Sequence, residues 1–540
     1  MGSGPEVKLL VSPKSTFQRL SEVVERQLPT LNAPGIAIGI TDREHTLHAD
    51  VFGLANREAG KPVTSETLFQ IGSISKSFTS IALLQVQEQG ILDINDPVTK
   101  YLPWLEIQSD YEPITLQHLM SHTAGIIMGS DDTPVAFTEA WNLRHTRVTV
   151  APGEMFNYSN TGYKTLGLVL ETVLGQDIST IFRERVFEPL GMSASLPDIR
   201  NDNRHLQATG YAPYFDDRPL PPGGQLAPAT WFESNTADGA ICSNAEDMCR
   251  YLQTLLQQGK GLLSPSSFEQ LIHPITPTND GLHGEHYGLG MFTQQIDGHH
   301  IIGHSGGMIG FTTDMLVDLD SELGVIVLTN GPAEPSKISR YVLRLFNAAL
   351  TGKELPDYSE DKLVNADDYV GKYRCGEQTF TLTSSDHSIF LNFDSATVPL
   401  SQLKPDRFIV PHPAFERFTL RMGRENEQVT EAGWGAERYV RVGFGDETPP
   451  ESPVEWDAYP GHYRSHNPWF SNFRVVPYHG TLVYLDQMGD DEPLHQLGPG
   501  LFRIGDDPRS PEFIRFDVVF NGKSMQAILS GGVYSRTFTL

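Results

Sequence analysis

The sequence predicts a mixed α/β domain over residues 15–355, followed by two small all-β units. Strand-like runs occur at both ends of this first region, and stretches with helical periodicity fill its middle. The remaining residues carry short strand-like runs separated by turn residues, with little helical periodicity. The 540 residues exceed one ordinary domain, and a hydrophobic content of 39% is sufficient for several cores.

The α/β region begins with one helix and two strands. Residues 15–28 place apolar side chains at helical spacing, with Ser15 expected as the N-cap. Residues 35–42 run apolar, and residues 46–56 alternate between apolar and polar side chains. We therefore expect a helix followed by a pair of strands.

The later part of the region supplies the other elements of the same sheet. Residues 77–93 carry a buried helical stripe, and Gly90 is a natural C-terminal stop for that helix. Residues 303–330 indicate a strand pair, and residues 336–350 indicate a helix. Because strands from both ends surround a mostly helical middle, we expect one sheet assembled from both ends of the domain.

The two all-β units are indicated by an internal repeat. The pattern D-x-Y-x-G-x-Y-R occurs at 367–374 and again at 457–464, 90 residues later. Two copies are too few for a solenoid, so they predict two similar units, 367–448 and 457–540, each large enough for a small barrel. The acidic, proline-containing stretch 356–366 is expected to be a linker.

Composition excludes several classes of function. The formal net charge of −27 repels phosphate backbones and anionic membranes, which argues against nucleic-acid and membrane partners. No apolar run approaches the roughly 20 residues of a membrane span, and residues 1–14, expected to be flexible, lack a secretory pattern. The three cysteines form no metal-type cluster, so we expect a cytoplasmic protein with no metal and no cofactor.

The stretch IGSISKSFTS at residues 71–80 contains the first candidate for catalysis. Ser73 and Lys76 lie one helical turn apart at the expected start of a helix, so the lysine amine can approach the serine hydroxyl. A serine is a poor nucleophile until a base takes its proton, and a buried lysine can supply that base. The same Ser-x-x-Lys spacing recurs outside any predicted helix, in Ser359/Lys362 and Ser401/Lys404.

Two further stretches contain polar residues suited to the same chemistry. Tyr158-Ser-Asn160 follows a proline-glycine turn, where the tyrosine could move a proton and the asparagine amide could bind substrate. Gly303-His-Ser-Gly-Gly-Met308 is expected to open an apolar strand, and its glycines would let a substrate lie against the strand. Taken singly, Tyr158 could be a packed aromatic residue, and His304 could be structural.

The three motifs in this order resemble those of the penicillin-recognising serine hydrolases, which include class C β-lactamases, DD-peptidases, esterases and D-aminopeptidases. Supporting phrases are LQHLMSHTAGI at 116–126 and GAICSNAEDMCRYL at 239–252. The resemblance implies a β-lactamase-like fold, with an antiparallel sheet flanked by helices and a helical subdomain. The layout with two β units resembles the three-domain D-aminopeptidases and implies lipocalin-like barrels.

The resemblance also implies a role for each residue near the nucleophile. Ser73 would attack the carbonyl carbon and form an acyl-enzyme, and Lys76 and Tyr158 would share the proton transfers. Asn160 would orient Lys76 and the substrate amide.

The third motif would complete the site. His304 and Gly306 would line the substrate-binding cleft, and the backbone N–H groups of Ser73 and Gly307 would form the oxyanion hole.

The histidine of the third motif indicates the class of substrate. The lactamases carry a lysine at this position, whose permanent charge suits a substrate carboxylate, and His304 supplies less charge. We therefore expect a D-aminopeptidase-like, amidase or esterase activity on a small molecule or short peptide. The alternatives are an acyltransferase or peptide-cyclising thioesterase, a β-lactamase and a non-catalytic scaffold. Residues 211–220 are a candidate pocket wall or a surface loop. Residues 466–474 are a candidate loop that blocks one end of the cleft, or aromatic residues that fill a barrel core or an inter-domain contact. The sequence predicts no oligomeric state.

Overall fold

A computed structural model describes residues 12–278, 286–358, 363, 365–445 and 452–537. The chain divides into two compact units. Unit 1 comprises residues up to Ala212 together with Leu226–Tyr358, and unit 2 comprises Pro213–Gln225 together with Ser359–Leu540. Most of the predicted flexible N-terminus and the Ser359/Lys362 pair lie outside the described residues. In the described part of the chain, no helix has the length and apolarity needed to cross a bilayer.

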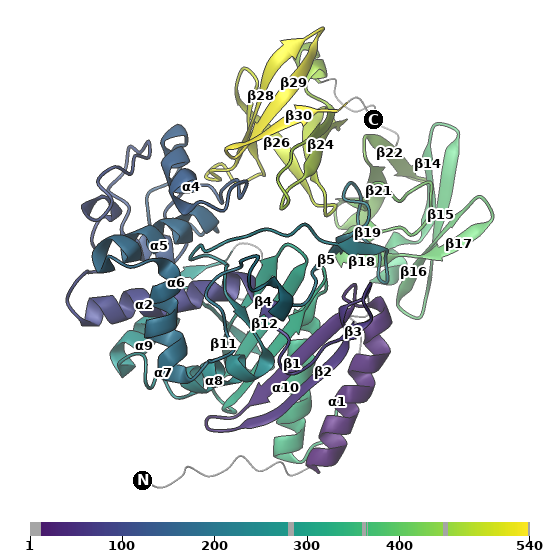
Figure 1. Ribbon diagram of the computed structural model, residues 1–540. Coiled ribbons are helices and arrows are strands. Elements are labelled where there is room, and N and C mark those ends of the chain that lie inside the picture. Colours follow the sequence, from purple (N-terminus) through teal and green to yellow (C-terminus); the bar gives the residue numbers. More distant parts are fainter. Residues whose placement is uncertain (1–11, 279–285, 359–362, 364, 446–451, 538–540) are drawn as a thin grey trace. The chain divides into compact units, whose positions relative to one another are not determined.

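The central feature of unit 1 is an antiparallel sheet whose middle strands come from opposite ends of the domain (Figure 1). Ile36 pairs with Thr329, so the early and late strands are direct neighbours, and the predicted single sheet is confirmed. In sheet order, the strands are β3 (Lys61–Pro62), β2 (Thr46–Asn56), β1 (Gly35–Thr41), β13 (Leu323–Thr329), β12 (Phe311–Asp318), β11 (His299–Met308), β10 (Phe292–Ile296), β9 (His286–Tyr287) and β8 (Thr276–Pro277). The predicted strand pair over 303–330 is thus three strands, and the motif containing His304 lies in the second half of β11 rather than at its start.

Helices cover both faces of this sheet. The helices α1 (Pro13–Gln27) and α10 (Pro335–Thr351) pack on the face to which Ile36, Ile38 and Ile40 of β1 contribute. On the other side α8 (Ala245–Leu256) approaches so closely that a methyl group on Gly39 would lie 2.9 Å from a backbone oxygen of α8. The expected N-cap was wrong by one turn, because Pro13 starts α1 and Ser12 precedes it.

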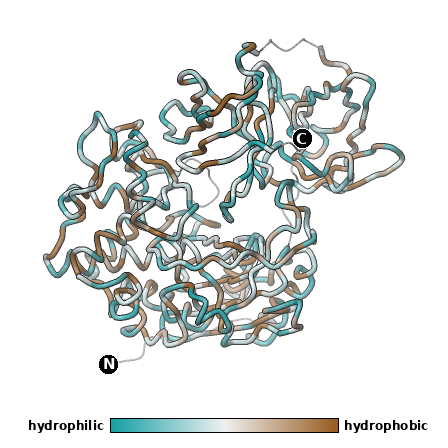
Figure 2. Tube along the Cα trace, turned by 45° about the horizontal axis from the view of Figure 1, so that its top comes forward, coloured by the Kyte–Doolittle hydropathy of each residue, from teal (hydrophilic) through white to brown (hydrophobic). Residues whose placement is uncertain are grey.

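The helical middle of unit 1 surrounds α2 (Ser75–Glu88), which has a more extensively buried surface than the predicted single stripe. Gly90 follows this helix with a φ of 70°, as expected for a C-terminal stop. The other helices of this part are α3 (Leu116–Met120), α4 (Ala136–Asn142), α5 (Asn160–Leu174), α6 (Ile178–Phe182), α7 (Glu188–Leu190) and α9 (Pro265–Ile272). Figure 2 shows hydrophobic and hydrophilic residues interspersed along the chain.

Unit 2 contains two antiparallel β structures in its described residues. The first is a nine-stranded sheet with β17 and β18 at its ends, and the second is a closed barrel. The sheet contains β14 (Gly371–Cys375), β15 (Gln378–Ser385), β16 (Ser388–Phe393), β17 (Ala396–Pro399), β18 (Ser401–Lys404), β19 (Arg407–Ile409), β20 (Leu420–Glu425), β21 (Gln428–Trp434) and β22 (Glu437–Arg441). The barrel contains β23 (Gly461–Arg464), β24 (Asn472–Tyr478), β25 (Thr481–Asp486), β26 (Asp491–Gly498), β27 (Leu501–Ile504), β28 (Phe513–Phe520), β29 (Lys523–Leu529) and β30 (Gly532–Arg536). The closed-barrel prediction therefore describes the second structure, whereas the first is a barrel-like sheet.

The two copies of the sequence repeat form the same local structure. In the first copy the Tyr373 hydroxyl donates to the backbone oxygen of Tyr369 at 2.7 Å. In the second copy Tyr463 makes the same bond to Tyr459, also at 2.7 Å. Each copy consists of a 3₁₀ turn followed by the first strand of its β structure. The repeat thus marks the start of each structure with a tyrosine that ties the strand to the preceding turn.

Residues 213–225, here called the strap, belong to unit 2 although they lie within the predicted α/β domain. The Asp216 carboxylate pairs with Arg464 and accepts a 2.8 Å hydrogen bond from the Ser471 hydroxyl. The Asp217 carboxylate pairs with Arg474 at 3.1 Å. Inside unit 2, these contacts join Asp216 and Asp217 of the pocket-wall candidate to Ser471 and Arg474 of the gating-loop candidate. Charge pairing between segments more than 200 residues apart has no local sequence pattern, so the packing of the strap with unit 2 could not be predicted from the sequence.

Candidate active site

Ser73 lies where a short strand turns into a helix. The strand β4 (Phe69–Gln70) is followed by a 3₁₀ turn (Gly72–Ile74) that continues directly into α2, which confirms the predicted position of Ser73 at a helix start. Gly72 adopts a φ of 56°, and a methyl group there would lie 2.6 Å from the Gly307 backbone nitrogen. Glycine at this position therefore lets the segment that carries Ser73 lie directly against β11.

Lys76 contacts the nucleophile candidate and two acceptor groups. Its Nζ lies 3.0 Å from Ser73 Oγ, 2.8 Å from Asn160 Oδ1 and 3.0 Å from the backbone oxygen of Asp238. The lysine side chain is buried completely. This spacing matches the expected approach of positions i and i+3 on one helical face.

Burial gives Lys76 the acid–base property that the site needs. Removal from water lowers the Lys76 pKa from 10.5 to about 8, and the positive charge of Lys164 acts in the same direction. The carboxylates of Asp238 and Asp131 partly oppose this effect by raising the pKa. A substantial fraction of Lys76 is therefore neutral near pH 8, and the neutral amine can accept the Ser73 proton.

Tyr158 has the opposite property. Burial raises the Tyr158 pKa well above its ordinary value of 10.0, and a hydrogen bond with Ser73 lowers it by less. The phenol therefore keeps its proton at neutral pH and acts as a donor. Lys76 Nζ lies 4.9 Å from the centre of the Tyr158 ring, so both groups flank Ser73.

Asn160 is the first residue of α5 and is held by a second buried cluster. Its Nδ2 donates to Asp131 Oδ2 at 2.9 Å, which directs Oδ1 toward Lys76. Asp131 also accepts a 2.5 Å hydrogen bond from Lys164 Nζ, one turn further along α5. Burial would lower the Lys164 pKa, but the charges of Asp238, Asp131 and Glu139 outweigh it and raise the pKa, so Lys164 stays protonated.

An aromatic cluster supports Tyr158 from behind. The His122 ring packs at 4.2 Å from the Tyr158 ring, measured between centres, and the Ser159 N–H donates to His122 Nδ1. Burial, together with the charges of Lys76 and His304, lowers the His122 pKa well below 6.5, so this imidazole is neutral. Tyr158 therefore packs against a neutral imidazole.

His304 lies in this aromatic cluster. Its ring centre is 6.4 Å from that of Tyr158. Nε2 lies 3.0 Å from the Tyr287 hydroxyl, and Nδ1 lies 2.5 Å from the backbone oxygen of Ser305. The side chain is 3% exposed. These contacts connect His304 to Tyr287 and to the Ser305 backbone, next to Tyr158.

The two glycines that follow differ in their surroundings. A methyl group on Gly306 would lie 1.9 Å from the backbone oxygen of Ile71, so only glycine fits there. The same group on Gly307 would meet no atom within 4 Å, because this glycine faces open space. The Gly307 backbone nitrogen is also the atom next to Gly72, which precedes Ser73. This places the two predicted oxyanion-hole residues on adjacent segments.

A possible cation site lies elsewhere in unit 1. His299, Asp318 and Asp320 offer ligand atoms within 4.8 Å of one another. Asp318 already accepts hydrogen bonds from the backbone N–H groups of Asp320 and Ser321 and from Asn347. His299 begins β11, so the group lies at the opposite end of that strand from Gly307. The hydrogen bonds of Asp318 hold together the turn that follows β12.

The structure thus brings Ser73, Lys76, Tyr158 and Asn160 into one constellation, with His304 behind Tyr158. The residues that the sequence did not reveal are Asp131, Asp238, Lys164, His122 and Tyr287. A signal was present for Lys164, a lone cation four residues after Asn160 in a helix of apolar character. Asp131 lies in a loop with a φ of 49°, where no periodicity identifies it.

Comparison with known proteins agrees with this geometry. The chain is 26% identical over 382 residues to penicillin-binding protein 4* of Bacillus subtilis (strain 168), which covers 64% of this chain and 80% of that protein. It is 29% identical over 366 residues to the unguisins hydrolase ungD' of Aspergillus campestris (strain IBT 28561), which covers 64% of this chain and 66% of that protein.

A solved structure and a family match extend the comparison. The octameric penicillin-binding protein homologue from Pyrococcus abyssi has a TM-score of 0.59 at 26% identity, covering 79% of this chain and all of that one. Residues 20–348, more than half of the chain, match the Beta-lactamase family. The protein therefore belongs to the Beta-lactamase family of serine hydrolases.

Proposed function

We propose that the protein hydrolyses small amides or esters through an acyl-enzyme on Ser73, with a D-aminopeptidase-like or esterase activity. The observation that carries this proposal is the 3.0 Å approach of the buried Lys76 amine to the Ser73 hydroxyl. The Lys76 pKa of about 8 makes that amine a usable base near neutral pH, whereas the raised Tyr158 pKa makes the phenol a donor. The name of one relative, unguisins hydrolase, describes the same type of reaction.

Acylation begins when neutral Lys76 takes the Ser73 proton. Ser73 Oγ then bonds to the substrate carbonyl carbon, and the carbonyl π electrons move to the oxygen. The backbone N–H groups of Ser73 and Gly307 would donate to this oxyanion. Loss of one such donor typically costs on the order of 10²–10³ in turnover.

The tetrahedral intermediate collapses when the bond to the leaving amine or alcohol breaks. Tyr158 would donate its proton to that leaving group and regain a proton from the Lys76 ammonium. Asn160 Oδ1 holds Lys76 during these transfers, and Asp131 fixes the Asn160 amide. Water then attacks the acyl-enzyme by the same steps in reverse order. Its proton would pass through Tyr158 to neutral Lys76, and the Lys76 ammonium would return a proton to Ser73 Oγ as the acyl bond breaks.

The surroundings of His304 favour substrates without a carboxylate in the third-motif position. A lysine there would present a permanent charge to a substrate, but His304 is buried and its ring nitrogens contact Tyr287 and the Ser305 backbone. This arrangement supports amide or ester hydrolysis over cleavage of a penicillin.

The test is a panel of p-nitrophenyl esters, D- and L-aminoacyl p-nitroanilides and a chromogenic cephalosporin, with Ser73→Ala as the inactive control. We expect turnover of an ester or aminoacyl substrate, and a loss of about 10³-fold or more in Ser73→Ala. A fluorophosphonate should label Ser73, as detected by peptide mass spectrometry. Failure of the wild-type protein both to turn over any substrate and to label Ser73 would refute the proposal. Addition of a free amine tests the alternative of acyl transfer, because a new amide product would then replace the acid.

A further inference from the structure

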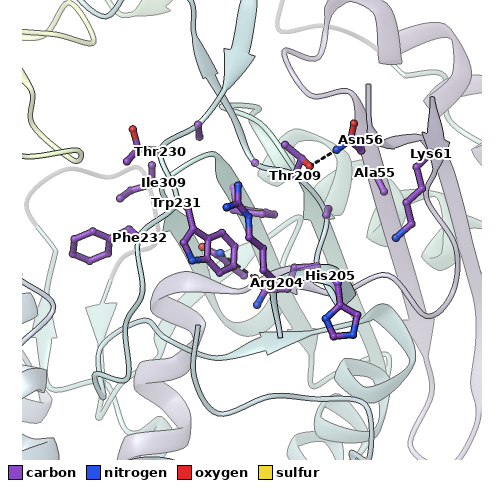
Figure 3. A pocket seen from close by; sticks show the side chains of 16 residues that line it. Ala55, Asn56, Lys61, Arg204, His205, Thr209, Thr230, Trp231, Phe232 and Ile309 are labelled. Atoms are coloured by element: carbon purple, nitrogen blue, oxygen red, sulfur yellow. Dashed lines mark hydrogen bonds between the residues drawn. The ribbon is translucent and has the colours of Figure 1, made fainter. Parts of the chain in front are cut away.

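A cavity of about 280 Å³ lies in unit 1, apart from the residues of the proposed acyl-transfer site (Figure 3). Its walls come from residues 204–210 and 229–232, from the ends of β2 and β3, and from the turn after β11. Several of these residues are exposed, so the cavity opens to solvent. None of Ser73, Lys76, Tyr158 and His304 lines it in the described structure.

The lining is basic in a strongly acidic protein. Lys61, Arg204 and His205 line the cavity, and its described lining includes no aspartate or glutamate. In a chain with a net charge of −27, three basic side chains around one cavity form a local region of opposite sign. The structure shows no carboxylate paired with Lys61 or Arg204 among its described residues. These cations are therefore available to an external anion.

Arg204 is held in place by an aromatic ring. Its guanidinium carbon lies 4.8 Å from the centre of the Trp231 ring, and Figure 3 shows the two side chains next to each other. Stacking on a ring restricts the guanidinium and leaves its edge free for bidentate contact with a carboxylate. This arrangement favours a ligand that carries hydrogen-bond acceptors.

The amide side chains of the walls are already engaged. Asn56 donates to the Thr209 hydroxyl at 2.8 Å, as drawn in Figure 3. Gln70 donates to Gln207 at 3.1 Å, and Gln207 donates to Asn203 at 2.8 Å. These bonds hold the walls together and leave the basic side chains as the groups able to bind a ligand.

The cavity is close to the nucleophile along the chain. Gln70 lines it and precedes Ser73 by three residues, a separation that spans at most about 10 Å. Ile309 lines it and follows Gly307 by two residues in the same hairpin. Tyr158, the proposed donor to the leaving group, is absent from its walls. A substrate whose leaving group lies at Tyr158 would direct its acyl part away from Tyr158, and this cavity is the candidate site for that part.

We propose that the cavity binds a carboxylate on the acyl part of the substrate, so that the preferred acyl groups derive from acidic amino acids or dicarboxylic acids. The proposal rests on the proposed hydrolase function. Arg204 would contact both carboxylate oxygens, Lys61 would contribute charge, and Trp231 would stack with Arg204. A charge-assisted hydrogen bond contributes more than a neutral one, so the carboxylate would decide between acyl groups of equal length.

The test compares mono-p-nitrophenyl esters of succinate, adipate and suberate with the neutral esters of butyrate, hexanoate and octanoate. The ratio of kcat/KM between each acidic ester and its neutral partner measures the contribution of the carboxylate. We expect this ratio to exceed one in the wild-type protein for the acyl chain that is long enough to reach from Ser73 to the cavity. The ratio should fall with added salt. Arg204→Ala should lower it about tenfold, mainly through KM, and Lys61→Ala should lower it less.

Arg200→Ala is the matched control, because Arg200 lies on the same segment, is exposed and does not line the cavity. It should leave the ratio unchanged, and free adipate should inhibit the acidic esters competitively. A ratio that stays within about twofold in Arg204→Ala overturns the inference, as does non-competitive inhibition by adipate.

A binding experiment separates this inference from the proposed function. Calorimetric titration of adipate into Ser73→Ala protein should show binding that Arg204→Ala weakens about tenfold or more. If no ester is hydrolysed and Ser73 is not labelled, the hydrolase proposal fails and so does the assignment to a substrate acyl group. If hydrolysis occurs but adipate binds equally to both proteins, only the cavity inference fails.

Discussion

At the scale of single residues, charged neighbours set the protonation of Lys76. Asp238 raises the Lys76 pKa and Lys164 lowers it, so changes at these two positions should move the pH profile in opposite directions. Activity should rise with pH through about 8, because Lys76 must lose its proton to act as base. Asp238→Asn should shift this midpoint down, and Lys164→Met should shift it up. Measurement of kcat/KM against pH for the three proteins checks the prediction.

Asp238→Asn tests the effect of charge on the Lys76 pKa with less change in structure than Lys164→Met. Asp238 Oδ1 is buried without a hydrogen-bond partner among the described residues, so asparagine keeps the shape and removes the charge. Lys164→Met breaks a buried ion pair with Asp131, which typically destabilises by about 3–5 kcal/mol, so its profile needs a parallel check of folding. Identical midpoints in wild type and folded Asp238→Asn would contradict the assignment of Lys76 as the titrating base.

The sequence revealed the site residues that belong to short motifs and missed those that belong to none. Ser73 and Lys76 share a helical turn, so their contact follows from spacing alone. Asp131 and Asp238 reach the site from segments without periodicity, and their effect on the lysine pKa values depends on the folded chain. The motif that contains His304 could be recognised in the sequence. Its contact with Tyr287 could not, because that contact depends on the folded chain.

At the scale of elements, the contact between the Ser73 turn and β11 depends on one glycine. Gly306→Ala places a methyl group against the Ile71 backbone, where no flexible side chain can move aside. We expect a destabilisation of about 3 kcal/mol or more, with loss of activity. Gly307→Ala is the matched control, because its methyl group meets no atom within 4 Å and should change stability by less than about 1 kcal/mol. Thermal unfolding of both variants measures the difference in stability. Equal melting temperatures would contradict the close contact between Gly306 and the Ile71 backbone.

The strap depends on charge pairs within unit 2. Burial alone would raise the Asp217 pKa, but hydrogen bonds from Arg218 and Arg474 outweigh it and lower the pKa below 3.8. Because the folded state binds this proton less readily than the unfolded state, the stabilisation is present above pH 4 and is lost as pH falls through the folded pKa. Arg474→Ala should therefore release the strap at neutral pH, and the wild-type strap should loosen only in acid.

Limited proteolysis measures strap release directly. Tyr214 and Phe215 are 56% and 49% exposed, so chymotrypsin can report on the mobility of this segment. Cleavage after Phe215 should be several-fold faster in Arg474→Ala than in wild type. Arg509→Ala removes an exposed pair with Asp507 in the same barrel and should leave the rate unchanged, because such pairs contribute little. Equal rates in all three proteins would show that the Asp217–Arg474 pair does not hold the strap.

Element by element, the sequence predicted most of unit 1 and the existence of both β structures. Apolar runs and periodicity located β1, β2, α2 and α10. It did not separate three strands from two over 303–330, since β11, β12 and β13 are joined by short turns within one apolar stretch. It also did not place the strap, because nothing local marks a segment whose partners are distant charges.

At the scale of the whole molecule, the two units have separate hydrophobic cores and three chain connections. One core lies between the unit 1 sheet and helices α1 and α10, and unit 2 has a core in each of its β structures. The chain passes between units after Ala212, after Gln225 and after Tyr358. Proteins with separate cores commonly depart from a single two-state transition. The connections alone do not merge the cores into one cooperative structure.

Calorimetry should therefore resolve more than one unfolding transition, and the variants described above assign them. Gly306→Ala changes packing inside unit 1, so it should lower one transition and leave the other in place. Arg474→Ala removes a pair inside unit 2, so it should lower the transition that Gly306→Ala leaves unchanged. Loss of activity on heating should follow the transition that Gly306→Ala shifts, because Ser73, Lys76, Tyr158 and Asn160 all belong to unit 1. A single transition that both variants lower equally would instead show that the strap and the linker join the units into one cooperative body.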